Sequence, residues 1–363
     1  MIDRLRSKTS GAFGPLKSEI GSTDEAVLKK YRDHGLFGTS QIRYGVICDP
    51  ELLKIVLAQM VQDYGITVYC NCLACGAVTE DGTVKGIIFE SKEGRRAIMA
   101  DVVIDCTGDG DIFALAGAEY ECSSFSTERS SNTALVFRLG GVDYKRYMSV
   151  FSTASHDPHG ELKSLKALSD TAGFSLRPFP SNRGDIMWIN NWIPNDCMTV
   201  RGLTDTAFLV LNAAEKITEH LRQNYPGMEN AYIIDFASQV GTRGSRRLKG
   251  DDRFTKENIA KRTGRQDLIA VVPTLGGTEE YARMEMPYGI LVPEKLDGLL
   301  TDQGCFSSDE AANEAANWIP HCIALGQAAG TAAGLSVQNC VQPRALDVNI
   351  IQSALKKQGV YLY

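Results

Sequence analysis

The sequence predicts an α/β fold, in which a parallel sheet is joined by a small antiparallel meander and interrupted by an inserted α+β region. The first observation is an apolar β-branched run, Val102 to Ile104, that breaks abruptly into the glycine turn Thr107 to Asp111. A meander pattern between residues 74 and 99 is the second. The third is a helix of small residues, 320–333, far along the chain.

Composition places the chain among ordinary globular proteins. Its 363 residues are 44% apolar and 23% charged, enough for two domains and a large core. The net charge of −6 comes without a basic stripe, which argues against nucleic acid or an anionic membrane surface as partner. The opening MIDRLRSKTS has no apolar leader, and no apolar run is long enough to span a membrane. The ten cysteines are therefore expected to be free thiols in a cytoplasmic protein.

Helices dominate the first part of the chain. Met1 to Arg6 has the character of a helix end, and residues 24–32 have helical composition with Thr23 as N-cap. A clearer helix runs from Glu51 to Tyr64, with Asp49 as its cap, a proline in its first turn and an apolar face.

Strands follow this helix. Residues 66–70 alternate between apolar and polar as a strand does. Residues 74–79 and 84–90 form a hairpin around Glu80-Asp81-Gly82, and a second turn at 92–94 leads to the central strand at Val102.

The region after residue 123 has a different pattern. It predicts strands at residues 133–139, 185–192 and 232–236, and a strong helix over 204–223. The basic segment 239–250 then carries Arg243, Arg246 and Arg247, whose rigid guanidinium groups suit a carboxylate or enolate. The alternative, a solvated basic turn paired with Asp251 and Asp252, stays open.

The glycine turn after Val102 is the main candidate for a ligand site, because ligands of open α/β sheets bind at the carboxyl ends of strands. An ordinary turn is the alternative. The run IDCTGDGDIFALAGA resembles the strand-to-loop motif of the FAD-dependent oxidoreductase family, which has the two-dinucleotide-binding-domain flavoprotein fold. The resemblance implies that Thr107, Gly108 and Asp109 lie beside FAD.

A second segment carries the same resemblance. PHCIALGQAAGTAA, residues 320–333, is similar to the flavin-facing helix of the family, and Cys305 matches a cysteine that precedes it. The resemblance implies cofactor contacts from Cys305 and from five helix residues: Gly326, Gln327, Ala328, Ala329 and Gly330. It places His321 at the start of that helix, where proton transfer and a structural role are both open. Because segment 239–250 resembles the family's G-x-R-x-SRRIVG, Arg243 and Arg246 are candidate catalytic residues.

The sequence also departs from the family. It contains no G-x-G-x-x-G, the fingerprint of the first βαβ unit, which holds the FAD pyrophosphate. The Gly-Arg pair expected before Cys305 is absent, and Asn317 stands where the family often has Arg. A start inside a longer reading frame, a second chain that supplies the unit, and a truncated relative that has lost FAD remain open as explanations.

These observations predict a domain order and two functions. Residues 1–122 and 291–363 are the two parts of an FAD-binding-type domain, and residues 123–290 are a substrate domain. The first function is hydride transfer between a small organic substrate and flavin. The alternative is a noncatalytic, FAD-free subunit that acts as a scaffold for a partner chain. A metal site at Cys70, Cys72 and Cys75 is not favoured, because no fourth ligand follows at a suitable spacing.

Overall fold

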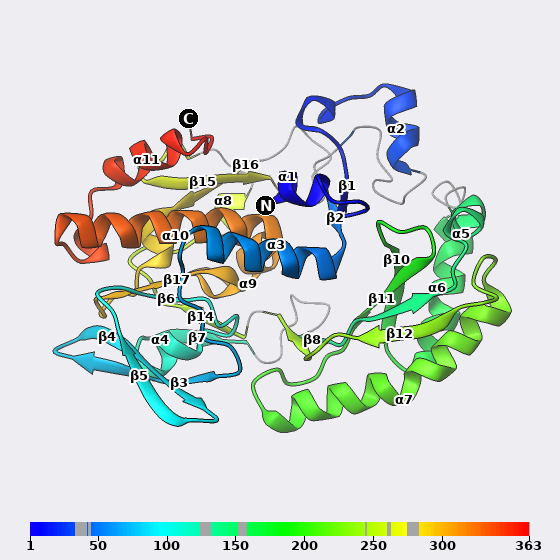
Figure 1. The fold of residues 1–363 in the computed structure, drawn as a ribbon, viewed down its shortest axis with the longest axis horizontal. Coiled ribbons are helices and arrows are strands. Elements are labelled where there is room, and N and C mark those ends of the chain that lie inside the picture. The colour runs from blue at the N-terminus through cyan, green and yellow to red at the C-terminus, as the bar shows by residue number, and fades with distance from the viewer. Residues whose placement is uncertain are drawn as a thin grey trace. The chain divides into compact units, whose positions relative to one another are not determined.

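A computed structural model describes residues 1–32, 42, 45–123, 132–151, 158–243, 245–259, 263–273 and 283–362 (Figure 1). Gly244, within the predicted basic segment, lies outside the described residues.

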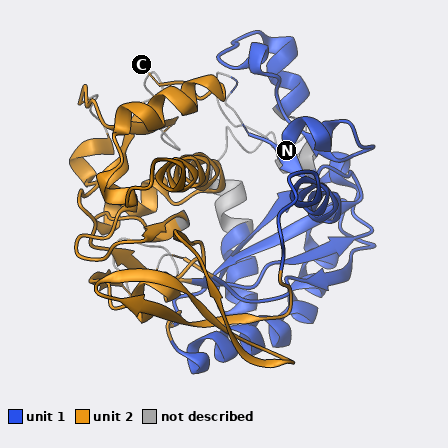
Figure 2. Cartoon of the chain, turned by 60° about the vertical axis from the view of Figure 1, so that its left-hand side comes forward, with its two compact units in different colours: residues 1–68, 133–195, 199–241 blue, residues 69–132, 196–198, 242–363 orange. Residues whose placement is uncertain are grey.

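The chain divides by its contacts into two compact units (Figure 2). Unit 1 comprises residues 1–68, 133–195 and 199–241. Unit 2 comprises residues 69–132, 196–198 and 242–363. In this division residues 1–68 group with part of the inserted region and residues 242–290 group with unit 2, whereas the predicted boundaries lie at 122 and 290. The assignment of these parts as FAD-binding and substrate domains stays a prediction.

Unit 1 combines short helices with one antiparallel sheet. Its elements are α1 (Ile2–Arg6), β1 (Ala12–Phe13), a 3-10 turn (Lys17–Glu19), α2 (Glu25–Arg32), β2 (Ile47–Cys48), α3 (Pro50–Asp63), β8 (Thr133–Ala134), β9 (Phe137–Gly140), α5 (Tyr144–Phe151), α6 (Pro158–Ala172), β10 (Ser175–Pro180), β11 (Ile186–Trp192), α7 (Val200–Asn224) and β12 (Tyr232–Phe236). The strand β13 (Gly241–Thr242) has its first residue in unit 1 and its second in unit 2.

The four-stranded sheet of unit 1 has the order β10-β11-β9-β12, all antiparallel. Alternate residues of its strands are buried, such as Leu139, Met187 and Ile189. They share one hydrophobic core with Val210 and Ile217 of α7. The period of two in the strands and the apolar stripe of α7 together bury one face of the sheet.

Two predicted elements of unit 1 differ in their bounds. The strand expected over 133–139 is split into β8 and β9, because the buried Asn191 side chain hydrogen-bonds both the backbone N–H and the carbonyl oxygen of Leu135. The helix expected from residue 204 begins at Val200, where the Thr199 hydroxyl caps it by accepting from the Gly202 N–H at 3.1 Å. In α2 the cap is Asp24, whose carboxylate accepts from the Ala26 N–H at 2.8 Å, and not the predicted Thr23.

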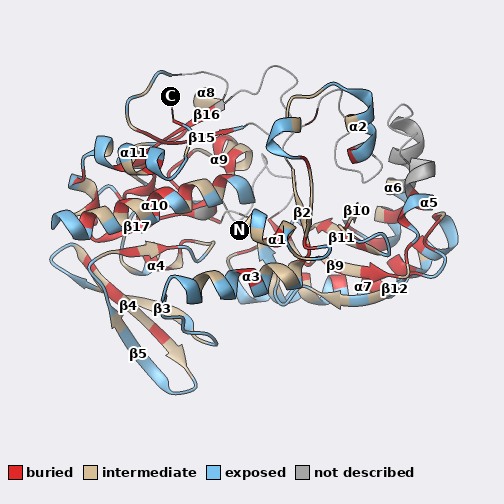
Figure 3. Cartoon of the chain, turned by 45° about the horizontal axis from the view of Figure 1, so that its top comes forward, coloured by how far each residue is buried: buried red, intermediate tan, exposed pale blue. Residues whose placement is uncertain are grey.

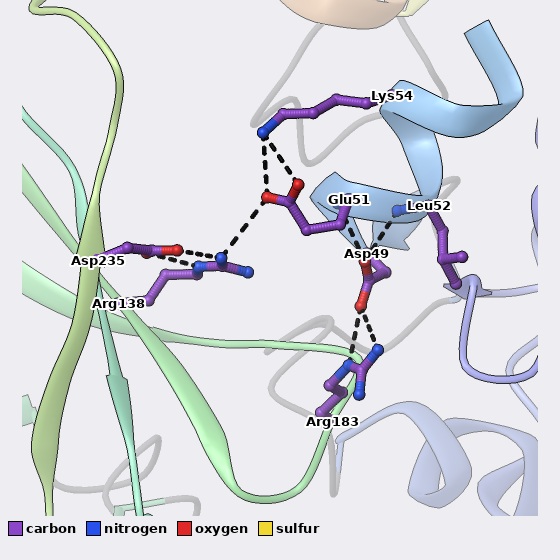
Figure 4. Close-up of polar contacts among 7 residues, drawn as sticks. All are labelled: Asp49, Glu51, Leu52, Lys54, Arg138, Arg183 and Asp235. Atoms are coloured by element: carbon purple, nitrogen blue, oxygen red, sulfur yellow. Dashed lines mark hydrogen bonds and ion pairs between the residues drawn. The ribbon is translucent and has the colours of Figure 1, made fainter. Parts of the chain in front are cut away.

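The N-terminus of α3 is tied to the rest of unit 1 by polar contacts (Figure 4). Asp49 caps the helix as predicted, accepting from the backbone N–H of Glu51 and Leu52 at 3.0 Å each. Its other oxygen pairs with Arg183 at 2.7 Å. Although burial opposes ionisation of Asp49, the Leu52 N–H and the Arg183 guanidinium hold the pKa of its carboxyl below the ordinary value.

The prediction of a strand over 66–70 is wrong, since these residues have no regular secondary structure. The apolar residues of this part of unit 1 also face solvent (Figure 3). Ile66 and Val68 are 56% and 54% exposed, and Ile55 and Leu57 of α3 are 47% and 44% exposed. A strand needs a neighbour to pair with its backbone groups, and the described residues pair none with this segment.

Unit 2 contains the predicted meander, the parallel strand pair and the small-residue helix. Its elements are β3 (Leu73–Glu80), β4 (Thr83–Ser91), β5 (Gly94–Met99), β6 (Val103–Asp105), α4 (Asp111–Leu115), β7 (Tyr120–Cys122), β14 (Arg246–Leu248), α8 (Lys256–Ile259), β15 (Leu268–Pro273), β16 (Arg283–Pro287), β17 (Leu299–Thr301), α9 (Glu310–Ala316), α10 (Ile319–Asn339), α11 (Val348–Lys357) and 3-10 turns at Tyr288–Leu291, Gln303–Cys305 and Pro343–Ala345.

The sheet pairings confirm the main prediction for unit 2. The strands β3, β4 and β5 form the expected antiparallel meander. Far apart in the sequence, β6 and β17 pair in parallel, with Thr301 opposite Asp105. The ends of both strands therefore lie at the same edge, followed by the glycine turn in one case and by Asp302 in the other. This mixed α/β architecture agrees with the predicted fold class.

The helix α10 packs one face into the main core of unit 2. Its residues Leu325, Ala328, Ala329 and Ala332 are fully buried, in one cluster with Leu300 of β17. The opposite face, with Ile323 and Gly330, is exposed. A helix with this many alanines and glycines can approach its neighbours closely.

Candidate functional site

The glycine turn after β6 is held in shape by Asp105, which is 2% exposed. Its carboxylate accepts from the backbone N–H and the hydroxyl of Thr107 at 3.0 and 2.7 Å, and from the Phe113 N–H of α4 at 2.8 Å. Gly108 and Gly110 have positive φ values of 89° and 68°, a conformation that favours glycine. A Cβ at Gly110 would lie 2.1 Å from the Phe113 ring.

A cavity of about 530 Å³ opens at the carboxyl edge of β6 and β17, entirely within unit 2. This volume lies within the range of small-molecule sites, about 300–1,000 Å³. The cavity brings together the glycine turn, the end of β17 and the first turns of α10. Its lining residues are Gly108, Thr242, Asp302, Gly304, Asn317, Ile319, Cys322, Ile323 and Gly326.

Two glycines of this cavity are covered by side chains of the chain itself. A Cβ at Gly304 would lie 2.6 Å from the Asn317 amide nitrogen, so Asn317 packs directly on that glycine. A Cβ at Gly326 would lie 2.6 Å from the Asp302 Oδ2. The resemblance implies arginine at the position of Gly304 and often at that of Asn317, and here the Asn317 side chain packs against the bare Cα of Gly304.

The helix α10 divides the predicted cofactor residues between its two faces. Gln327 and Gly330 are exposed on one face, where nothing lies within 4 Å of a Cβ built at Gly330, and Gly326 lies on the same face beneath Asp302. Ala328 and Ala329 have no exposed surface, since they turn into the core. At 100° per residue, consecutive positions cannot all face one ligand. Of the five, Gly326 alone is among the residues that line the cavity.

His321 faces away from the cavity. It is 1% exposed, and its Nε2 lies 2.8 Å from the Pro273 carbonyl oxygen at the end of β15. Because a carbonyl only accepts, Nε2 carries the proton, and Nδ1 has no hydrogen-bond partner among the described residues. Burial lowers the pKa of His321, so that the imidazole is neutral. These contacts fit an anchor for the start of α10, and its predicted catalytic role stays a prediction.

The basic segment 239–250 meets the glycine turn through Asp109. The Asp109 carboxylate accepts from the Thr242 hydroxyl at 2.9 Å and the Ser245 hydroxyl at 2.6 Å. Burial raises the pKa of Asp109, and the two hydroxyl groups offset part of that effect. Asp109 thus fixes one wall of the cavity, between Gly108 and Thr242, and its carboxylate is engaged within the chain.

The three arginines of this segment, Arg243, Arg246 and Arg247, are each paired with a carboxylate of unit 2, that of Arg247 being Glu121 at 3.1 Å. Arg243 lies 2.7 Å from Glu314 and stacks on the Trp318 ring. Arg246 lies 2.7 Å from the Asp111 carboxylate, and its Nη1 donates to the Asp109 carbonyl at 2.9 Å.

Neither Arg243 nor Arg246 pairs with Asp251 or Asp252, the partners that the sequence suggested. Asp251 pairs with Arg344, and Asp252 with Arg265. Arg243 and Arg246 therefore brace the cavity wall, and substrate binding by them stays a prediction.

Three thiols surround the turn. The Cys305 Sγ donates to the Gly108 carbonyl at 3.0 Å, and burial raises the pKa of Cys305 well above its ordinary value. Burial, with Asp302 nearby, raises the pKa of Cys106 to about 12 and of Cys322 to about 11. All three are therefore neutral thiols at neutral pH, unsuited to act as nucleophiles.

Sequence reasoning missed several residues of the cavity. Asp302 had a usable signal, because a carboxylate directly after a buried strand lies at the ligand edge of a parallel sheet. Ile319 directly precedes the small-residue helix and Ile323 lies within it; they are 77% and 49% exposed, which only the structure reveals. In the described part of the chain, no three His, Cys, Asp or Glu side chains are grouped as a metal site. None of its helices combines the length and apolarity needed to cross a bilayer.

Three solved structures are similar to this chain at low identity. A flavin-dependent brominase triple mutant is 10% identical with a TM-score of 0.40, and the match covers 86% of this chain and 64% of that one. A geranylgeranyl bacteriochlorophyll reductase-like protein from Thermoplasma acidophilum is 12% identical with a TM-score of 0.43, covering 95% and 74%. A myxobacterial chondrochloren halogenase is 8% identical with a TM-score of 0.42, covering 89% and 58%.

Comparison with curated protein sequences gave no match. A family model described as FAD dependent oxidoreductase matches residues 7–355, which is nearly the whole chain. The two segments that carry this likeness in the sequence, the glycine turn and the small-residue helix, border one cavity. The chain belongs to the FAD dependent oxidoreductase family.

Proposed function

We propose that this chain binds the isoalloxazine ring of FAD in the cavity beside Gly108 and Gly326, and that it takes part in hydride transfer between a small organic substrate and that flavin. The observation that carries the proposal is the shared cavity: two glycine-bearing segments, far apart in the sequence, line it together. Bound flavin would supply the hydride acceptor or donor, a chemistry that no amino-acid side chain provides.

The residues of the cavity fit a planar, largely apolar ring. Ile319 and Ile323 are 77% and 49% exposed, and both line the cavity. Solvent-exposed isoleucines at a concave surface gain free energy when an apolar ring covers them. Gly108 lets the backbone approach closely, because no Cβ stands between its peptide and a ligand. The same residues offer no arginine or lysine to a diphosphate, so the fit concerns the ring portion of FAD.

The chain's own residues would hold the ring and keep the cavity in shape. Asp105 and Asp109 fix the turn, Cys305 fixes the Gly108 carbonyl, and Arg246 links the turn to β14. We place the substrate near Arg243, which directly follows the cavity residue Thr242 in the sequence. Its guanidinium pairs with Glu314 and lies over the Trp318 ring.

Titration of the purified protein with FAD tests this proposal. We expect saturable quenching of flavin fluorescence and a shifted visible absorption band. The Ile323→Arg variant should lose that binding, because the new side chain occupies the cavity. Ile350→Arg is the matched control, since Ile350 of α11 is 41% exposed and does not line the cavity. If Ile323→Arg and Ile350→Arg bind FAD with equal affinity, FAD does not bind in this cavity. If the wild type does not bind FAD, the proposed function is refuted.

A second candidate function is the binding of a partner chain that supplies or covers a βαβ unit. It is favoured by the exposed apolar residues of α3 and of the unpaired segment 66–68 in unit 1. Light scattering of the purified protein, alone and after Leu57→Asp, measures its mass. A complex that dissociates in the variant supports this function, and a monomer in both cases, with FAD bound, contradicts it.

A further inference from the structure

We propose that the Asp302 carboxylate accepts a hydrogen bond from a ring N–H of the ligand in this cavity, and so determines which planar rings bind there. This inference rests on the proposed flavin function and adds a residue and a ligand group to it.

Asp302 is placed by the parallel strand pair. Thr301 lies opposite Asp105, so the next residue emerges at the edge where the glycine turn begins. Its backbone N–H donates to the Asp105 carbonyl at 3.1 Å, which fixes its position. The residue is 5% exposed and lines the cavity, and its Oδ2 lies over the Cα of Gly326 on α10. The carboxylate is therefore held between the sheet edge and the helix.

Among the described residues that line the cavity, Asp302 is the only charged one. A carboxylate repels phosphate and carboxylate groups of a ligand and attracts hydrogen-bond donors. It offers about four acceptor positions, so contacts within the protein leave room for a ligand donor. The nearby thiols of Cys106 and Cys322 are neutral and bring no competing cation. The ligand part that suits this place is a neutral ring edge that carries an N–H.

The chemistry of the flavin ring then names the donor. Oxidised isoalloxazine has a single ring N–H, at N3. A charged acceptor buried beside it binds more strongly than water would, whereas a ring methylated at N3 leaves Asp302 without that donor. A preference for the unmethylated ring is the measurable consequence.

Lumiflavin and 3-methyllumiflavin test the inference, because both lack the ribityl chain and the adenine, whose hydroxyl and amino groups are other possible donors. Each is titrated by fluorescence quenching into wild type, Asp302→Ala, Asp302→Asn and Asp101→Asn. Asp101 is an exposed carboxylate of the same unit that does not line the cavity. We expect wild type and Asp101→Asn to bind lumiflavin about tenfold more tightly than its methylated form.

The two variants separate hydrogen bonding from shape. Asp302→Ala should bind both rings equally. Asp302→Asn keeps the size of aspartate but has a weaker, neutral acceptor, so its preference should fall about threefold or more. Full preference in Asp302→Asn would mean that size alone discriminates, and would overturn the inference. This variant and the wild type decide the matter even where Asp302→Ala does not fold.

The remaining outcomes distinguish the inference from the proposed function. If wild type binds both rings equally, or binds FAD and neither ring, Asp302 is not the acceptor and the flavin function stands. If wild type binds neither FAD nor lumiflavin, the proposed function fails and the inference fails with it.

Discussion

Replacement of Gly326 by alanine tests the packing of Asp302 against α10. The new Cβ would lie 2.6 Å from the Asp302 Oδ2 and 3.6 Å from its Cγ. Carbon and oxygen that are not bonded rest at about 3.3–3.6 Å, so the carboxylate must move by roughly 0.7–1 Å. Asp302 is 5% exposed, and a shift of that size in a packed site costs about 1–3 kcal/mol.

Gly334 provides the matched control on the same helix. It is exposed, and nothing lies within 4 Å of a Cβ at this position. Alanine is favoured over glycine in a helix interior by about 1 kcal/mol, so Gly334→Ala should stabilise the protein by that amount. Gly326→Ala has the same gain in helix propensity but must displace Asp302. Its free energy of unfolding should therefore lie about 1–3 kcal/mol below that of Gly334→Ala.

Urea unfolding followed by circular dichroism measures these differences. The decisive comparison is the double variant, because Asp302→Ala removes the atom that Gly326→Ala displaces. In that background Gly326→Ala should stabilise the protein by about 1 kcal/mol, as at Gly334. If Gly326→Ala and Gly334→Ala stabilise the wild type equally, the carboxylate does not occupy the space over α10.

Three further outcomes are expected from side chains whose contacts lie within unit 1 or within unit 2. Arg246→Ala should weaken FAD binding in a fluorescence titration, because it releases the glycine turn from β14. The control Arg201→Ala removes an exposed ion pair with Asp205 and should leave FAD binding unchanged. Asp49→Ala should lower the free energy of unfolding by about 2 kcal/mol, and Asp49→Asn by less, since asparagine still caps α3. Because the pKa of the Asp49 carboxyl is lowered in the folded protein, its charge contributes stability above about pH 4, and this contribution is lost as the pH falls through the pKa of the folded state. Because burial lowers the pKa of His321, the stability that depends on its neutral imidazole is complete above about pH 6.5 and declines as the pH falls through the pKa of the folded state. The melting temperatures at pH 5 and pH 7.5 should therefore differ less in His321→Phe than in the wild type.

Local signals in the sequence were sufficient for much of the secondary structure. The hairpin around Asp81 and Gly82 formed as predicted, because both residues take the positive φ that its turn requires. Asp49 and Pro50 began α3 as predicted for the same kind of local reason. The strand predicted over 66–70 failed because its alternation describes a strand only when a neighbour pairs with it, and no local signal supplies a neighbour.

The site divides in the same way. By itself the sequence determined that the Gly108 turn and the helix around Gly326 exist, since glycine turns and runs of small residues are local features. Only the tertiary structure decided that the two border one cavity, that Ala328 and Ala329 turn into the core, and that Asp302 lies over Gly326. Which face of a helix meets a ligand depends on what buries the other face, and residues far along the chain supply that burial.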